Sequence, residues 1–153
     1  MLAVIDAIDL RLAPFDRELC RYARRQPGCK ALMGHYGIGE LTSVAILSEL
    51  GDCRRFSSSR HAVRYAGLDI TVYQSDQRRS PGHLSRQGPP TLRWALYEAA
   101  VIASRTGSPD DDYYLQARAR LGHKRACLAI ARKLLKRSYH SLRELGDKAL
   151  GPA

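Results

Sequence analysis

The stretch RYAGLDITVYQSDQRRSPGHLSRQGPPTLRW, from Arg64 to Trp94, joins two helical parts of the chain. It leaves an amphipathic segment, crosses a long run rich in Ser, Arg, Gly and Pro, and re-enters a helical pattern at Thr91. Long loops inside a small domain are uncommon and are usually functional or disordered. After Asp76 its charged residues are all positive, and hydroxyls and one histidine accompany them: Arg78, Arg79, Arg86 and Arg93, with Ser75, Ser80, Ser85 and His83. A phosphate backbone is the expected partner of such a loop.

Composition points the same way. The chain has 153 residues, of which 44% are hydrophobic, enough for one domain with a core. Lys and Arg number 25 against 15 Asp and Glu, a formal net charge of +10. That charge favours nucleic acid or an anionic membrane as partner, although a solvated basic surface without a partner has the same composition. No apolar run approaches the roughly 18 residues of a membrane span, and no signal peptide follows Met1, so we expect a soluble cytoplasmic protein.

The four cysteines are far apart and form no C-x-x-C pair. We expect Cys20, Cys29, Cys53 and Cys127 to be reduced thiols on or near helix faces, and we expect no zinc site.

Residues 1–28 open with a heptad pattern. Apolar side chains alternate in steps of three and four residues, at Ile5, Ile8, Leu12, Phe15, Leu19 and Tyr22. Such a seam predicts either a helix packed on its own domain or a coiled-coil arm that dimerises. Pro14 should end, start or kink this helix, and Pro27-Gly28 should break it. The helical pattern begins without an N-cap, which predicts that an N-terminal part of a longer protein is missing.

A G-I-G turn follows. Gly37, Ile38 and Gly39 separate a short apolar helix from a second helix that Gly51 ends. This order resembles a helix-hairpin-helix, in which backbone N–H groups and a positive helix end bind phosphate. A purely structural corner between helices is the alternative.

Three further helix starts are predicted. Residues 56–59 should cap a helix that ends at Gly67, and Thr91 should cap a helix with one apolar stripe, Leu92, Ala95, Leu96, Ala99 and Ile102. Asp110, Asp111 and Asp112 should occupy a first turn, where the helix dipole favours acids. As metal ligands they are too close in sequence and too exposed.

From Tyr113 to Arg143 the chain has nine Lys or Arg and no acidic residue. An apolar stripe, with Ala126, Ile130 and Leu134, runs beside the cations Lys124, Arg125, Arg132, Lys133, Lys136 and Arg137. A helix of this design buries one face and offers the other to phosphates. A membrane-surface helix has a similar pattern but also bulky Trp or Phe anchors, which are absent from this segment.

Together these patterns predict an all-α, mostly helical fold. It comprises an N-terminal heptad helix, a helix-hairpin-helix-like core, a long basic Ser/Arg loop and basic C-terminal helices. Only residues 70–73 read as strand.

From about Leu32 to Leu142 the sequence resembles the C-terminal domain of insertion-sequence transposases of the 110/116/902 type, a family that includes the Piv DNA invertase. The resemblance rests on an ordered series: G-I-G, R-F-S, Y-A-G-L, Q-S, G-H-L-S-R-x-G and L-R-x-A-L. It implies a recombinase with an N-terminal RuvC-like domain, whose acidic residues bind divalent metal, and a serine that links covalently to DNA. Many members also use a structured guide RNA.

This resemblance divides the chain into residues 1–28, a coiled-coil-like remnant of the linker to a missing RuvC-like domain, residues 29–146, the DNA-binding and serine domain, and a tail, 147–153. It implies that Mg²⁺ belongs to the missing domain and that this chain carries no cofactor. Expected partners are DNA, a structured guide RNA and a second copy bound through the N-terminal helix, with no membrane.

The resemblance places the nucleophile at Ser75, with Ser85 as second candidate. Asp76 stands where the family has glycine, and its carboxylate would repel a scissile phosphate. His83 is the only base nearby in sequence. The nucleic-acid contacts are predicted at Gly37, Ile38, Gly39, Arg78, Arg79, Arg86, Arg93, Lys124, Arg125, Arg132, Lys133 and Lys136. Two functions remain: a serine recombinase domain, or a truncated, catalytically inactive transposase that only binds nucleic acid.

Overall fold

The computed structural model describes residues 2–70, 74–75, 78–79 and 84–152, and it confirms the all-α prediction. The α-helices are α1 (Leu2–Arg25), α2 (Pro27–Met33), α3 (Glu40–Leu50), α4 (Ser59–Tyr65), α5 (Pro90–Ala103), α6 (Asp111–Leu121) and α7 (His123–Leu145). Two short 3-10 helices, η1 (Cys53–Arg55) and η2 (Gly146–Leu150), and two short strands, β1 (Gln74–Ser75) and β2 (Arg78–Arg79), complete the described elements.

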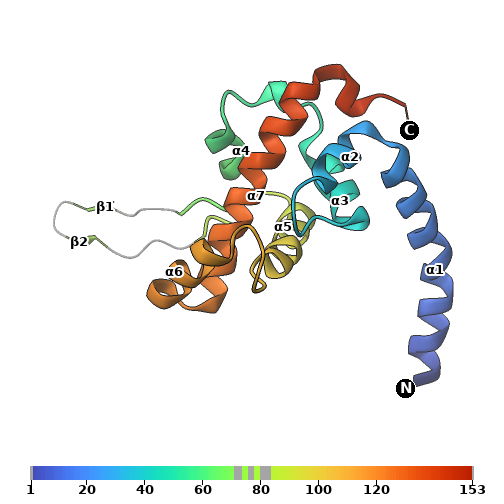
Figure 1. Cartoon of the computed structure of the whole chain (residues 1–153), viewed down its shortest axis with the longest axis horizontal. Coiled ribbons are helices and arrows are strands. Elements are labelled where there is room, and N and C mark those ends of the chain that lie inside the picture. The colour runs from blue at the N-terminus through green and yellow to red at the C-terminus, as the bar shows by residue number, and fades with distance from the viewer. Residues whose placement is uncertain (1, 71–73, 76–77, 80–83, 153) are drawn as a thin grey trace.

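Helix α7 is the centre of the fold. Helices α2, α4, α5 and α6 pack against it, and α3 lies between α5 and α1 (Figure 1). The predicted apolar stripe of α7 is confirmed, because Ala126, Ile130 and Leu134 are fully buried. The apolar face of α7 therefore packs into the core, and the cations of α7 lie at the edges of that face.

Local sequence explains most helix ends. The Ser58 hydroxyl caps α4 by accepting a hydrogen bond from the His61 N–H, as predicted for residues 56–59. Gly51 ends α3 with a φ of +54°, a conformation that favours glycine. The basic C-terminal segment is divided by Gly122, whose φ is +78°, into α6 and α7.

Two expectations for α5 were wrong in detail. The helix begins at Pro90 rather than after a Thr91 cap, because proline has no N–H to satisfy at the first helical position. Ile102 is 38% exposed, whereas the neighbouring Ala103 is fully buried. The close approach of the G-I-G turn to this end of α5 needs a small residue, which is why alanine faces inward there.

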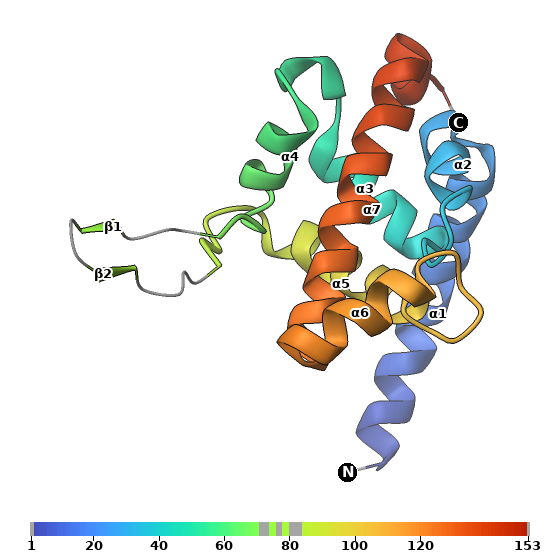
Figure 2. The same cartoon turned by 60° about the vertical axis from the view of Figure 1, so that its left-hand side comes forward.

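Strands β1 and β2 lie at the end of an arm that projects away from the helices (Figure 2). The strands pair antiparallel. Closer to the helices, Ile70 and Leu84 form an isolated antiparallel bridge, so the outgoing and returning segments of the arm run side by side at its base. We call residues 67–70 and 84–88 the arm root. Residues 71–73 of the predicted strand-like run lie outside the described residues.

Helix α1 extends from the other side of the molecule (Figure 1). It continues through Pro14 and ends at Arg25, next to the predicted Pro27-Gly28 break. Its N-terminal seam does not pack on its own domain: Ile5, Ile8, Leu12 and Phe15 are all at least half exposed, which rules out that alternative for this part of the helix.

The predicted tail begins as part of the fold. Ala149 in η2 is buried, and the buried amide of Gln26 donates a hydrogen bond to the Gly151 carbonyl at 3.0 Å. The Gln26 side chain also accepts a hydrogen bond from the Gly28 N–H and so caps α2. One side chain thereby joins the start of α2 to the C-terminal residues.

Candidate nucleic-acid interface

The arm brings the first candidate serine next to a predicted phosphate contact. In the pairing of β1 with β2, Ser75 lies opposite Arg78 and Gln74 lies opposite Arg79. A serine can act as the nucleophile in phosphoryl transfer, and an arginine can stabilise the charge that develops on the phosphate. Asp76 and His83, which the sequence analysis discussed as neighbours, lie outside the described residues.

The second candidate serine lies in the arm root. The Ser85 hydroxyl donates a 2.5 Å hydrogen bond to Oδ1 of Asp69, and the Ser85 N–H donates to the Asp69 carbonyl at 3.2 Å. Asp69 is a site residue that the sequence analysis missed, because it precedes Ser85 by sixteen residues and lies on the outgoing segment of the arm, whereas Ser85 lies on the returning segment. Its position directly after Y-A-G-L was the only available signal.

The arginines near the arm root have different roles. Arg86 is exposed, so its side chain is available to a ligand. The Arg93 guanidinium instead donates hydrogen bonds to the Gly88 and Ala66 carbonyls. Arg93 therefore holds the root in place, whether or not it also contacts phosphate.

The predicted cations of α7 also differ in their surroundings. Lys124, Arg125 and Lys136 are exposed, as a phosphate contact requires. Arg132 is partly buried and donates from Nε to the Leu68 carbonyl at 2.6 Å, and this burial lowers the pKa of Arg132. Lys133 Nζ lies 2.7 Å from Oδ1 of Asp110. Any phosphate contact of Arg132 or Lys133 would thus be additional to a contact within the fold.

Asp110 is the second residue whose role the sequence analysis missed. It is 2% exposed, and it accepts hydrogen bonds from Lys133 and, with both oxygens, from Arg137 at 2.6 and 2.9 Å. Burial by itself would raise the pKa of Asp110, but the hydrogen bonds from Arg137 and Lys133 outweigh it and hold the pKa below the ordinary value. The aspartate thus fixes α6 to α7 instead of only beginning a helix.

The G-I-G turn has a packing role. Ile38 is buried, and a Cβ on Gly37, whose φ is +96°, would collide with the Ala99 carbonyl oxygen of α5. At the start of α3 the Gly39 N–H donates to the Thr42 hydroxyl, and the nearby Glu40 carboxylate forms a 2.5 Å ion pair with Arg24. The structure thus gives the turn the role of a corner between helices, and phosphate binding there stays a prediction.

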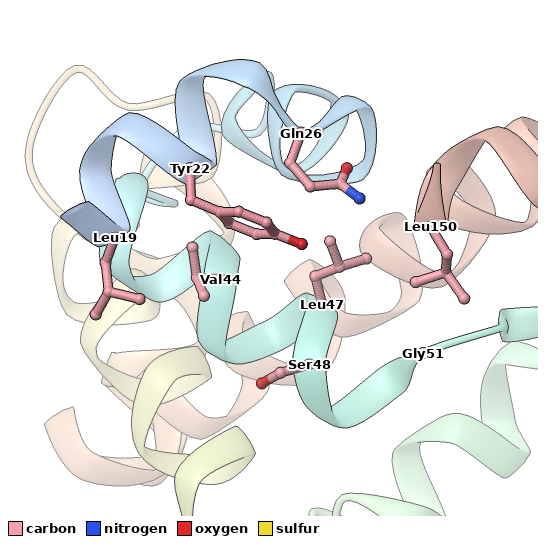
Figure 3. Close-up of a pocket in the computed structure, with 8 residues that line it drawn as sticks. All are labelled: Leu19, Tyr22, Gln26, Val44, Leu47, Ser48, Gly51 and Leu150. Atoms are coloured by element: carbon pink, nitrogen blue, oxygen red, sulfur yellow. The ribbon is translucent and has the colours of Figure 1, made fainter. Parts of the chain in front are cut away.

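A separate apolar groove lies between α1, α3 and η2 (Figure 3). Its volume is about 420 Å³, and its lining residues are Leu19, Tyr22, Gln26, Val44, Leu47, Ser48, Gly51 and Leu150. None of these is a predicted nucleic-acid contact. Leu19 and Tyr22 are the last two residues of the heptad seam, so the groove continues the apolar face of α1.

Within the described ranges no three His, Cys, Asp or Glu side chains form a metal-like cluster. All four cysteines are free thiols. No helix in the same part of the chain has the length and apolarity of a membrane span.

Comparison with known proteins identifies the family of the chain. Residues 29–115 match the family described as Transposase IS116/IS110/IS902 family. The chain is 26% identical over 129 residues to the transposase for insertion sequence element IS1111A of Coxiella burnetii, covering 82% of this chain and 35% of that protein. It is 33% identical over 111 residues to the pilin gene-inverting protein of Moraxella bovis, covering 71% and 34%.

A probable family 20 transposase of Pseudomonas aeruginosa is 24% identical over 101 residues, 66% of this chain and 30% of that protein. The chain thus spans about a third of the length of the curated relatives it matches. The family match covers more than half of the chain and includes the G-I-G turn, the arm and α5. The chain therefore belongs to the IS116/IS110/IS902 transposase family.

Proposed function

We propose that this chain binds DNA and contributes the serine nucleophile to strand cleavage and rejoining during transposition of an insertion sequence. The pairing of Ser75 with Arg78 on the projecting arm is the observation that carries the proposal. An arm of this kind can reach a phosphate in a duplex held by the helices, since it extends away from them (Figure 2).

In the proposed step the Ser75 hydroxyl oxygen attacks a backbone phosphorus. A serine–phosphorus ester bond forms, the bond from phosphorus to one deoxyribose oxygen breaks, and the hydroxyl proton passes to a base while the leaving oxygen takes up a proton. Attack of the freed sugar hydroxyl of another strand reverses these bond changes and releases Ser75. Arg78 and Arg79 would stabilise charge on the phosphate oxygens.

The remaining cations would hold the flanking backbone. Sequence-independent phosphate contacts would come from the exposed cations Arg86, Lys124, Arg125 and Lys136. The net charge of +10 would add a general attraction to the phosphate backbone. A structured guide RNA would bind through the same kind of contact. Because the reaction acts on genomic DNA, the proposal places the protein in the bacterial cytoplasm, at the nucleoid when bound.

Mg²⁺ enters the proposal with the RuvC-like domain that the family resemblance implies. The described residues contain no cluster of metal-ligand side chains, so we assign no metal-binding role to them. When bound in that domain, the metal would stabilise charge on the reacting phosphate.

We also propose that two copies pair through α1. The exposed seam at Ile5, Ile8, Leu12 and Phe15 supports this pairing. In a parallel pair Arg11 lies near Asp16 of the second copy, whereas an antiparallel pair brings Asp9 near Asp16 of the second copy. Charge complementarity therefore favours the parallel arrangement.

A second candidate function is nucleic-acid binding without chemistry. Asp76 favours it, because a carboxylate next to the nucleophile repels the phosphate that Ser75 must attack. The binding surface is common to both functions, and only the covalent intermediate separates them.

The test is adduct formation. The chain is incubated with nicked or branched DNA from the ends of its own element, with Mg²⁺ and guide RNA, and products are separated in SDS. The proposal expects an SDS-stable protein–DNA adduct that disappears in Ser75→Ala and remains in Ser80→Ala, a matched serine of the same loop. Loss in Ser85→Ala but not in Ser75→Ala would move the nucleophile to Ser85. Tight, salt-sensitive binding with no adduct would favour the second function.

A further inference from the structure

The arm root is held by hydrogen bonds between its two segments and by arginines of two helices. The returning segment donates two backbone hydrogen bonds to the outgoing segment, from the Ser85 N–H to the Asp69 carbonyl and from the Arg86 N–H to the Gly67 carbonyl, both at 3.2 Å. At the crossing point a Cβ on Gly88 would collide with the Tyr65 carbonyl oxygen. The two segments therefore approach at a distance that only glycine permits, and this close packing defines the backbone position at the start of the arm.

Helices α5 and α7 each hold this geometry through an arginine. Arg93 of α5 donates to carbonyls on both chains, those of Ala66 and Gly88. Arg132 of α7 donates to the Leu68 carbonyl at 2.6 Å. Both arginines bind backbone, so they fix where the arm starts regardless of the side chains farther along it.

Asp69 joins these contacts through its side chain. Its Oδ1 accepts the 2.5 Å hydrogen bond from Ser85, and its Oδ2 lies 3.9 Å from Nε of Arg64 on α4. The carboxylate therefore joins the outgoing segment of the arm to the returning segment and lies near α4, while Arg132 holds the adjacent Leu68 carbonyl to α7.

We propose that Asp69, together with Ser85 and Arg132, is a positioning site that sets the direction of the arm and thereby places Ser75 at a DNA phosphate. This inference rests on the proposed function of Ser75. In this assignment Ser85 is a hydrogen-bond donor within the root and not the attacking hydroxyl. Its hydroxyl donates to Asp69, and this contact ties the returning segment of the arm to the outgoing one.

The charge of Asp69 makes the inference testable. The carboxylate of Asp69, 3.9 Å from Arg64 on a basic surface, weakens the attraction of phosphate to that surface. If Asp69 acted only through its charge on phosphate binding, its neutralisation would strengthen DNA binding and would not slow reactions at position 75. If Asp69 positions the arm, its neutralisation should strengthen DNA binding and yet slow reactions at position 75.

A disulfide-tethering experiment measures position 75 directly. Ser75→Cys is introduced together with Cys20→Ser, and the chain is mixed with duplex DNA that carries an activated disulfide on one backbone phosphate. The other thiols compete little, because burial raises the pKa of Cys29, Cys53 and Cys127, to about 11 for Cys53. Tethering is timed at saturating DNA, so that differences in affinity do not enter.

In this background Ser85→Ala should slow tethering by about three- to tenfold, the factor that one hydrogen bond represents. Ser85→Thr, which keeps the hydroxyl, should restore it, and Ser57→Ala, which removes an exposed hydroxyl elsewhere, should leave it unchanged. Asp69→Asn should tighten DNA binding in a fluorescence anisotropy titration while slowing tethering. Thermal unfolding of each variant verifies that the helical fold is intact.

Equal tethering rates in the parent, Ser85→Ala and Asp69→Asn would overturn the positioning role and leave the proposed function standing. DNA binding by the parent without any tethering would overturn the placement of Ser75 at a phosphate, and the positioning role with it. Failure of Ser85→Thr to restore the rate would also overturn the inference, because the hydroxyl would then not be the group that acts.

Discussion

Asp110 and Arg137 form a two-pronged ion pair between the start of α6 and the middle of α7, with N–O distances of 2.6 and 2.9 Å. Lys133 adds a further hydrogen bond to the same carboxylate. Asp110 is almost fully buried, whereas Lys133 and Arg137 are more than a third exposed. The carboxylate is thus the member of the cluster that solvent cannot hydrate if its partners are removed.

Asp110→Asn should reduce the free energy of unfolding by about 2 kcal/mol, less than the loss typical of fully buried pairs because both cations remain partly hydrated. Urea unfolding at neutral pH measures this loss. Asp112→Asn, which changes an exposed aspartate of the same first turn, is the control and should have little effect.

The same pair predicts a pH dependence. The hydrogen-bonded carboxylate has a folded pKa below its ordinary value of 3.8, so its stabilisation is fully present above that pH and is lost as the pH falls through the folded pKa. The stabilities of the parent and Asp110→Asn should therefore converge in acid. A constant difference down to the acid limit would contradict the assignment.

Lys133 and Lys136 separate binding from stability on one helix. Replacement of both with Gln should weaken DNA binding evenly across sequences and flatten the salt dependence by about 0.9 in slope for each phosphate that a lysine neutralises. Singly, Lys136→Gln should weaken binding and flatten the slope without changing stability, because Lys136 is exposed, whereas Lys133→Gln should also lower stability through Asp110. Anisotropy titrations at several salt concentrations measure the slopes, and a loss confined to certain sequences would mean that α7 reads bases.

The glycines of the G-I-G turn should respond differently to alanine. Gly37→Ala introduces a Cβ against the Ala99 carbonyl at a positive φ and should cost about 2–4 kcal/mol in unfolding free energy. Gly39 has a φ of −93°, and a Cβ there would lie 3.9 Å from the Thr42 hydroxyl, so Gly39→Ala should leave stability nearly unchanged. If the turn also binds phosphate, Gly39→Ala will weaken DNA binding without changing the melting temperature, and an unchanged affinity would leave the turn a structural corner.

The heptad seam predicts an oligomer. Ile8→Glu places a charge in the exposed seam and should convert a dimer to a monomer in sedimentation velocity. Leu10→Glu is the matched control, because Leu10 is 78% exposed but lies outside the seam. A dimer that survives Ile8→Glu would exclude the seam as the interface.

The sequence by itself determined the helical class, the apolar stripe of α7, a helix cap within residues 56–59 and the break at Gly51. These features depend on residues within one or two turns of each other, so periodicity and capping chemistry were sufficient. The family resemblance similarly came from an ordered series of local motifs. The start of α5 and the exposure of Ile102 differed from expectation because a proline and a neighbouring turn decided them.

Only the tertiary structure decided which charged and hydroxyl groups meet. Asp69 reaches Ser85 across the arm, and Asp110 reaches Lys133 and Arg137 across 23 and 27 residues. Neither pairing has a periodic signal, because chain crossings and helix packing bring these groups together. Arg132 and Arg93 likewise show only positive charge in the sequence. Their hydrogen bonds to carbonyls at the arm root depend on where α5 and α7 pack against it.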